Sequence, residues 1–509
     1  MQQYISGEVI IYSAKCEEQK EFEWNLPEYL PGISRIVKTD VLAEKCIFGN
    51  DGKNAFIDVS VKVRILYVSD HEGKLKSAVF NQKAALSFKE PFEIKEDFTA
   101  VPSCFINGIH AKPVTSRKIA AAFSITGGVT VFRQEKLALF CEEENEGVCV
   151  LKSKVPVCSR ITLADSDFEH TSGITMDSSK PPIGEIIYSA AVFSGIKANA
   201  GDGFADFEAR FDIIVLYEIS DSNAQTGTYT TLLCPITVKD TLTDSRITKN
   251  HMPFLYIDIS SAEPSVSFDS FGENKELSFD IKYSVSGFLY CQEEKEIVSD
   301  AFYEYSDNSA QTTGIFLDCM KNTISRTERV SETARYDMSG MQEISECMAR
   351  LLSVSFEQSE GKLFAAAKCK FEILGTNASG ELICTDCPVT LHMPLGENQV
   401  NPAVSVPDII LTINSCSAEI SKGSLVCTAE ISAQGVVTER SEFGVVSSID
   451  AEETGKNNKC PHEIVICYPA KNDALWDIAK KYKRSPEKIK LFNGIENDDI
   501  SSERFLIIP

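Results

Sequence analysis

Residues 59–94 read VSVKVRILYVSDHEGKLKSAVFNQKAALSFKEPFEI, and they decide the fold class of the chain. Every second residue from Val59 to Tyr67 is apolar, which is the pattern of a half-buried β-strand. A polar turn over residues 70–73 follows, and a second strand begins at Leu75. The stretch therefore predicts two antiparallel strands joined by a tight turn.

The same phrase of strand, polar turn and strand returns at residues 207–240 and 364–395. A second phrase alternates with it, in which an apolar strand precedes a strand pair. The predicted strand pairs span residues 118–131 (broken at Gly127 and Gly128), 277–288 and 425–437, and the strands before them span 106–110, 254–259 and 409–413. A period of roughly 130–180 residues indicates duplicated domains rather than a solenoid.

Helices are predicted at only two places in this body. Residues 340–352 have helical periodicity, and residues 41–46 are a weaker candidate. The sequence therefore predicts a mainly β protein of three tandem modules, followed by a small α+β domain. The predicted boundaries are 1–165, 183–306 and 314–450 for the modules, 451–460 for a linker and 461–509 for the small domain, with polar separators at 166–182, 307–313 and 451–459.

The repeated β phrase resembles the SPOCS domain, a β-rich module of endospore-forming Firmicutes that is associated with the spore coat. Residues 59–94 carry the resemblance most closely, and residues 207–240 and 364–395 match more loosely. The resemblance rests on strand phrasing and not on catalytic residues. It implies that three SPOCS-like modules have a structural role during sporulation.

Residues 461–509 predict two short helices on a two-stranded sheet. Apolar residues alternate over 464–468 as in a strand, and Asn472 and Asp473 are an N-cap signal for a helix. The apolar face of that helix consists of Leu475, Ile478, Ala479 and Tyr482. A second helix is expected to start at Pro486 after Ser485 and to end at Gly494 in a left-handed conformation. The expected core is Leu475, Trp476, Ile489, Phe492 and Ile508.

This stretch resembles a LysM domain, a β-α-α-β module whose known ligands are N-acetylglucosamine polymers such as peptidoglycan. The residues that carry the resemblance are Leu475, Trp476, Ile478, Ala479, Tyr482, Asn493, Leu506, Ile508 and Pro509. Two loops depart from the family, because Asn472-Asp473-Ala474 replaces Gly-Asp-Thr or Gly-Asp-Ser, and Ser502-Glu503-Arg504 replaces Pro-Gly-Gln. Losing a glycine and a hydroxyl beside the sugar groove predicts weaker glycan binding and favours a protein ligand. Ordinary divergence in a working glycan-binding domain is the other interpretation.

The predicted binding surface of this domain combines these loops with the helical residues beside them. It comprises Asn472, Asp473, Ala474, Trp476, Lys480, Arg484, Asn493, Glu503 and Arg504. Trp476 also suits a core position. The helical part is locally basic, which is typical of a solvated helix face and also of a surface for a partner.

Composition restricts where the chain can act. A net charge of −24 and a sequence pI of about 4.8 should repel nucleic acid and anionic membranes. The N-terminus lacks the pattern of a signal peptide, and no apolar stretch is long enough for a membrane-spanning helix. The 17 cysteines follow no regular spacing, so we expect reduced, buried thiols. A cytoplasmic location is therefore expected, which conflicts with peptidoglycan as the ligand.

The sequence carries none of the common catalytic motifs. The sequence contains no Walker A loop, no G-x-G-x-x-G after a strand, no G-x-S-x-G and no H-E-x-x-H. Cys384 and Cys387 form a lone C-x-x-C in a strand-rich stretch, which favours a core role over zinc or redox chemistry. Cys460 and His462 are weaker metal candidates. We expect no enzyme activity, no cofactor and no metal.

Two functional interpretations follow. In the first, the chain is a non-catalytic scaffold of the spore coat, and its LysM-like domain docks a coat-basement morphogenetic ATPase at the forespore surface. SPOCS-like repeats followed by one LysM domain are an arrangement of clostridial spore-coat proteins, and that resemblance implies this partner. In the second, the chain is an exported protein that binds peptidoglycan in the cell wall or spore cortex. A hydrolase with a LysM targeting domain is disfavoured because the body carries no catalytic motif.

Overall fold

The computed structural model describes residues 4–52, 54–91, 98–140, 147–220, 227–305, 310–334, 340–359, 362–396, 405–421, 423–449, 464–470, 473–501 and 504–509. The body of the chain consists of long β-strands, and the only helices in the described residues lie near the C-terminus. The predicted linker at residues 451–460 lies outside the described residues.

The strands of the body fall into three units. Unit 1 contains β1 (Tyr4–Asn25), β2 (Ile33–Asn50), β3 (Asn54–Ser69), β4 (Leu75–Pro91), β5 (Thr99–Thr115) and β6 (Lys118–Ala138). Unit 2 contains β7 (Val148–Thr175), β8 (Ile183–Gly201), β9 (Phe204–Ile219), β10 (Tyr229–Thr243), β11 (Met252–Phe268) and β12 (Asn274–Tyr303). Unit 3 contains β13 (Ala310–Ala334), β14 (Glu343–Ser359), β15 (Lys362–Thr376), β16 (Leu382–Gly396), β17 (Ser405–Ser421) and β18 (Ser424–Ile449).

Each unit is a pair of three-stranded antiparallel sheets. The first sheets have the strand orders β2-β3-β4, β8-β9-β10 and β14-β15-β16, and the second sheets have the orders β1-β6-β5, β7-β12-β11 and β13-β18-β17. A large apolar cluster fills the space between the two sheets of each unit. The alternation of apolar residues in the central strands β3, β9 and β15 produces these cores, because every second side chain points inward.

The first sheets share details that sequence phrasing alone does not show. The pairing register shifts at the same place in each, between Ala43 and Lys45, between Phe193 and Gly195, and between Leu351 and Ser353. The hydroxyl of Tyr67 donates to the carbonyl of Pro31 at 3.0 Å, and the hydroxyl of Tyr217 donates to that of Pro181 at 3.1 Å. Gly375 takes the equivalent place in unit 3, where a Cβ atom would lie 2.2 Å from the carbonyl oxygen of Glu343.

A buried charged network joins the three units. Lys38 on β2 forms an ion pair with Glu372 on β15 at 2.7 Å and a hydrogen bond with the hydroxyl of Tyr188 on β8 at 2.9 Å. That hydroxyl donates to Asp40 at 3.0 Å, and Arg350 on β14 reaches the same carboxylate at 3.1 Å. Burial alone would raise the pKa of Glu372, but the surrounding cations outweigh it and hold that pKa far below its usual range.

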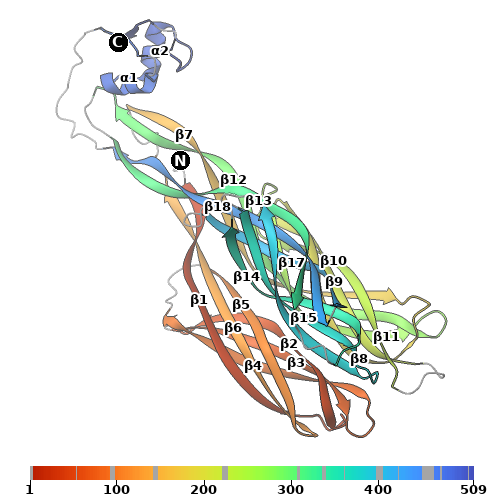
Figure 1. The fold of residues 1–509 in the computed structure, drawn as a ribbon. Coiled ribbons are helices and arrows are strands. Elements are labelled where there is room, and N and C mark those ends of the chain that lie inside the picture. The colour runs from red at the N-terminus through yellow and green to blue at the C-terminus, as the bar shows by residue number, and fades with distance from the viewer. Residues whose placement is uncertain are drawn as a thin grey trace.

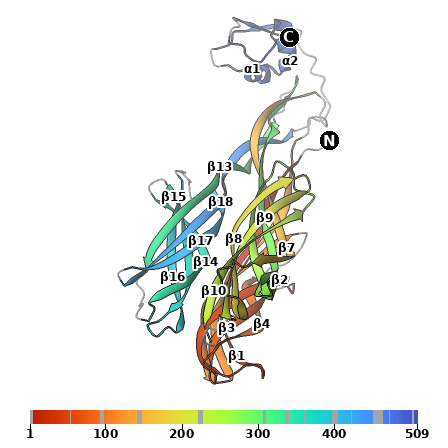
Figure 2. The same cartoon turned by 90° about the vertical axis from the view of Figure 1, so that its right-hand side faces the viewer.

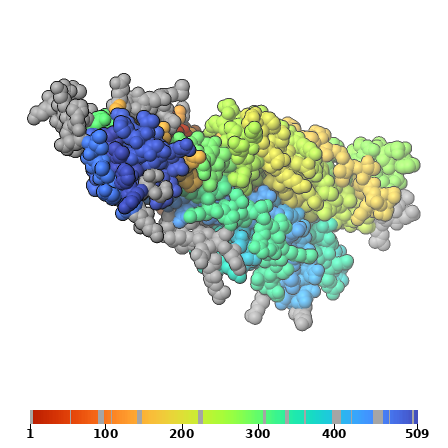
Figure 3. All heavy atoms as spheres, turned by 90° about the horizontal axis from the view of Figure 1, so that it is seen from above, coloured from red at the N-terminus to blue at the C-terminus, as the bar shows by residue number. Residues whose placement is uncertain are grey.

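The views in Figure 1 and Figure 2 show how the units are arranged. Unit 3 forms a lobe of its own beside unit 2, and unit 1 lies at the end of the molecule away from the small C-terminal domain. That domain lies beyond the ends of β7 and β12, and Figure 3 shows it at one end of the molecule.

Several sequence-based expectations are corrected by these strands. Residues 340–352 and 41–46, predicted as helices, lie largely in β14 and β2. The predicted strand pair at 118–131 is part of the single strand β6, without a break at Gly127 and Gly128. The boundary placed at residue 165 falls inside β7, so most of the predicted separator at 166–182 is strand and not linker. Likewise, β13 includes the last residues of the separator predicted at 307–313.

Candidate functional site

The C-terminal domain has the predicted β-α-α-β order. It consists of β19 (Val465–Cys467), α1 (Leu475–Tyr482), α2 (Pro486–Asn493) and β20 (Leu506–Ile508). The two strands pair antiparallel, and the buried core is made by Leu475, Ile478, Ala479, Ile489, Ile500, Leu506 and Ile508. Gly494 has φ of 66° and ends α2 in the left-handed conformation, as predicted. Phe492, predicted for the core, is 60% exposed.

The side chain of Asn493 has a structural role, because its polar atoms bond to the backbone of the domain and are not offered to a ligand. Its side-chain amide donates to the carbonyls of Ile489 at 2.8 Å and of Ile507 at 2.7 Å, and its side-chain oxygen accepts from the Ile507 amide at 2.7 Å. These three bonds fasten the end of α2 to β20. The side chain is therefore used for folding, which explains why the sequence resemblance included it.

The helical face predicted to bind a partner is occupied by the end of β12. The indole Nε1 of Trp476 donates to Asp300 at 2.9 Å, and the ammonium of Lys480 contacts the same carboxylate at 2.7 Å. The ring of Phe302, fully buried at 0% exposure, lies 5.1 Å from the Trp476 ring, centroid to centroid. Phe302 thus belongs to the core of the C-terminal domain although it comes from unit 2.

A second set of contacts surrounds Glu304 and Tyr305. The carboxylate of Glu304 accepts from the backbone N–H of Ser485 at 2.7 Å and pairs with Lys488 at 2.8 Å. The guanidinium of Arg484 lies 4.2 Å from the ring centroid of Tyr305, a cation–π geometry. The Tyr305 N–H donates to the carbonyl of Lys483 at 3.1 Å. The domain is therefore docked on unit 2 by charge, aromatic and backbone contacts.

These contacts shift the titration of the groups involved. Partial burial acts to raise the pKa of Asp300, but the hydrogen bonds from Lys480 and Trp476 outweigh it and lower that pKa. Hydrogen bonding to Glu304 raises the pKa of Lys488. Both shifts favour the charged forms, so the docked arrangement favours the ion pairs at neutral pH.

The structure divides the predicted binding residues into separate groups. Trp476, Lys480 and Arg484 face unit 2, and Asn493 is internal. Asp473 accepts a hydrogen bond from the Ala470 N–H at 2.9 Å, Ala474 is the N-cap of α1, and Arg504 is exposed before β20. Asn472 and Glu503 lie outside the described residues. The predicted N-cap role of Asp473 is therefore corrected, since no side chain caps α1.

One exposed apolar surface of this domain escaped the sequence analysis. Strand alternation places Val465 and Cys467 against the core and turns their neighbours outward. We call this surface the outer sheet face, and its large apolar residues are Ile464, Ile466, Tyr468 and Phe505. Ile464 is 73% and Tyr468 is 72% exposed. The alternation over 464–468 predicts a strand, but a three-residue strand does not indicate which of its sides the helices cover.

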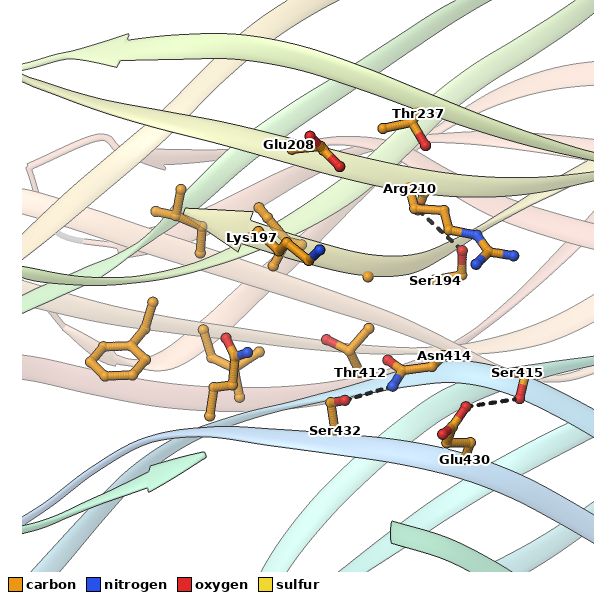
Figure 4. Close-up of a pocket in the computed structure, with 16 residues that line it drawn as sticks. Ser194, Lys197, Glu208, Arg210, Thr237, Thr412, Asn414, Ser415, Glu430 and Ser432 are labelled. Atoms are coloured by element: carbon orange, nitrogen blue, oxygen red, sulfur yellow. Dashed lines mark hydrogen bonds between the residues drawn. The ribbon is translucent and has the colours of Figure 1, made fainter. Parts of the chain in front are cut away.

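A second candidate surface lies between units 2 and 3. Figure 4 shows polar side chains of β8, β9 and β10 facing those of β17 and β18 across a cleft of about 610 Å³. Its charged residues balance, with Lys197 and Arg210 against Glu208 and Glu430. Many of its groups bond within their own unit, as Asn414 does to Ser432 at 2.6 Å. The cleft offers both donors and acceptors of hydrogen bonds.

Neither a metal cluster nor a membrane helix is found in the part of the chain that the structure describes. No group of three or more His, Cys, Asp or Glu side chains there could hold a metal ion. The described helices are also too short or too polar to cross a membrane.

Comparison with known proteins supports the C-terminal assignment. Residues 470–509 match the LysM domain family, which covers α1, α2 and β20. Comparison with curated proteins and with solved structures gave no match for the chain. The chain is therefore a mainly β protein that carries a C-terminal LysM domain.

Proposed function

We propose that this protein is a non-catalytic assembly scaffold whose LysM domain docks another protein. The observation that carries the proposal is the outer sheet face, where four large apolar side chains are exposed on a domain of small size. Clustered exposed apolar residues mark surfaces that bind proteins more often than surfaces left to water. The Trp476 face is already covered by β12, which leaves the outer sheet face available for a partner.

The body of the chain supports a scaffold role by its construction. Three double-sheet units are joined through a buried charged network, and the LysM domain lies at one end of this extended body (Figure 1). The resemblance of the strand phrases to SPOCS domains extends the proposal to the spore coat. In this form, the chain acts in the mother-cell cytoplasm at the forespore surface, and its partner is the coat-basement morphogenetic ATPase.

Glycan binding is the second candidate function, and the family match favours it. LysM domains bind glycans such as peptidoglycan or chitin. In the loops that replace the family's Gly-Asp-Thr and Pro-Gly-Gln, Ala474 lacks the hydroxyl, and Asn472 and Glu503 stand where the family has glycine. These substitutions favour the protein ligand over the glycan.

The two functions are separated by binding assays on the full chain. We expect Ile466→Glu and Tyr468→Glu to abolish capture of the purified morphogenetic ATPase, since a charge on the outer sheet face opposes burial against a protein. Phe271→Glu is the matched control, because Phe271 is 88% exposed in the turn between β11 and β12, far along the chain from the LysM domain. Co-sedimentation with purified peptidoglycan that survives both glutamate variants, without any ATPase capture, would favour the glycan function instead.

A further inference from the structure

Three pairs of free cysteines lie between the two sheets of a unit, one pair in unit 1 and two pairs in unit 3. Cys46 on β2 faces Cys104 on β5 in unit 1, and both thiols pack against the core between the sheets. In unit 3, the pairs are Cys347 on β14 with Cys416 on β17, and Cys387 on β16 with Cys427 on β18. In every pair, one thiol belongs to the first sheet and the other belongs to the second.

The two thiols of each pair lie next to each other in the same core cluster. Cys104 raises the pKa of Cys46, Cys416 raises that of Cys347, and Cys387 raises that of Cys427, as neighbouring thiols on packed strands do. The Sγ atom of Cys416 also lies 3.4 Å from the backbone carbonyl oxygen of Cys347, so these two residues touch through backbone as well as side chain. Thiols this close, on strands that already pack together, need little movement to reach bonding distance.

Unit 2 provides the contrast within the same chain. Its core cysteine, Cys234 on β10, is fully buried, and burial raises the pKa of its thiol to about 12. Its surroundings in the described residues are the apolar side chains of the unit 2 core, in which it is the only cysteine. The double-sheet architecture therefore does not by itself place thiols opposite one another.

We propose that Cys46–Cys104, Cys347–Cys416 and Cys387–Cys427 are oxidation sites that form disulfides between sheets when the chain meets a low-molecular-weight disulfide. One protein thiolate attacks a sulfur of that disulfide and releases one small thiolate, which takes up the proton lost by the protein thiol. The second protein thiol, on losing its proton, attacks the resulting mixed disulfide and releases the second small thiol. Each protein pair loses two hydrogens and two electrons, and the small disulfide is reduced to two thiols.

The local environment indicates which sulfur attacks in the first pair of unit 3. The hydrogen bond from the Cys347 thiol and a further one from the Ala349 N–H lower the pKa of Cys416 despite its burial. At the same time, bonding to Cys416 and burial raise the pKa of Cys347. Of the two thiols, Cys416 therefore has the lower pKa, and the lower-pKa thiol of a pair is the usual point of attack in exchange reactions.

Exposure sets the expected order of oxidation. Cys46, Cys104, Cys347 and Cys416 are partly exposed, whereas Cys387 and Cys427 are 1% and 0% exposed. An oxidant can reach the first two pairs in the folded chain, but the third pair needs local opening of unit 3. Once formed, these links would restrain units 1 and 3 covalently and leave unit 2 as it was.

The test is oxidation of the reduced full chain with oxidised glutathione, followed by alkylation of remaining thiols and peptide mapping. We expect linked peptides for Cys46–Cys104 and Cys347–Cys416 first, and for Cys387–Cys427 later. Cys104→Ser and Cys416→Ser should each remove one link only and leave the partner cysteine as a glutathione mixed disulfide. Cys234→Ala is the control variant, in which all three links should persist.

Two results would overturn the proposal. One is that the paired cysteines of the folded wild-type chain accumulate glutathione adducts without closing to disulfides. The other is that links form among many cysteines, in the same distribution that the chain gives when it is oxidised in denaturant. Because folding is checked by circular dichroism before oxidation, a misfolded variant is not mistaken for either result.

Discussion

Two charged interfaces hold this molecule together, and they are built in opposite ways. At the junction of the three units, Lys38 and Glu372 keep only 7% and 1% of their side-chain surface exposed. At the LysM dock, which is the contact between the LysM domain and the end of β12, Lys480 and Asp300 keep 41% and 22% of their side-chain surface exposed. Water screens the second pair but not the first, so the same chemistry has a different energetic role in each place.

This difference indicates that the three units are held in one arrangement, whereas the LysM domain is held by contacts that are more open to water. A buried ion pair is weak evidence of net stabilisation. Removing one partner, however, leaves a buried charge without solvent, and this strongly lowers the stability of the fold. The junction therefore fixes the three units in one arrangement. The LysM dock relies on contacts that water can replace, together with burial of Phe302 and Trp476.

Replacing the central carboxylate of the junction should have the largest effect. We expect Glu372→Gln to lower the free energy of unfolding by about 3–5 kcal/mol, because Lys38 would stay buried without its partner. Urea denaturation followed by circular dichroism measures the change. Glu357→Gln, an exposed position on β14, is the control and should change little. Equal stability of both variants would show that the junction contributes no specific interaction.

The second largest effect is expected from acid, which should weaken the ion pairs of the junction. Because the pKa of Glu372 is lowered in the folded chain, its stabilisation is present above the unfolded-state pKa of about 4.3 and is lost as the pH falls below it. Wild-type stability should therefore decline from pH 5 to pH 3 more steeply than that of Glu372→Gln. Urea midpoints at each pH measure the two slopes. Parallel slopes would assign the acid response to other carboxylates.

Removing the carboxylate of Asp300, which Trp476 and Lys480 share at the LysM dock, should have a smaller effect than the two changes at the junction. We expect Asp300→Asn to weaken docking of the LysM domain by about 1–2 kcal/mol, since Lys480 and Trp476 both lose a charged acceptor. Hydrogen exchange of α1 in the full chain should rise, while exchange in β15 stays unchanged. Glu496→Gln, an exposed position in the same domain, is the control. Unchanged exchange in α1 would mean that apolar contacts alone hold the dock.

The central strands and the LysM helices could be predicted from sequence because their patterns are local. Residues 59–67, 207–217 and 364–374 lie in β3, β9 and β15, as their alternation indicates. The predicted helix at 340–352 was wrong because β14 contains two register shifts. Ile344 and Leu351 face the core between the sheets, whereas Met348 packs on the opposite face of the strand against units 1 and 2. The helix-like spacing of these three residues therefore combines both faces of an irregular strand.

Glycines misled the prediction for β6. Gly127 and Gly128 suggested a turn, yet the strand passes through both without a break. A Cβ atom on Gly127 would lie 2.7 Å from the Leu86 side chain across the core. The glycine is therefore needed for close packing and not for a turn.

The site was less predictable than the fold because its partners are far apart in the chain. The sequence of α1 predicts Trp476 and Lys480 as surface candidates, but their partners Asp300, Phe302 and Glu304 belong to another unit. No local pattern links them. The outer sheet face was missed for a related reason, since its exposure depends on which side of a short strand the helices cover.

Salt should cause the smallest change in free energy, and it should affect only one of the two interfaces. Raising the salt from 0.05 M to 0.5 M should weaken the dock by about 0.5 kcal/mol through screening of the exposed pairs at Asp300 and Glu304, and should leave the buried junction unaffected. In a Trp24→Phe background, Trp476 is the remaining tryptophan, and its emission should shift to the red as the indole gains water. The control is Asp300→Asn in the same background, where the salt response should shrink because one of the screened pairs is gone. A response of the same size in both proteins would place the salt sensitivity outside the Asp300 contact.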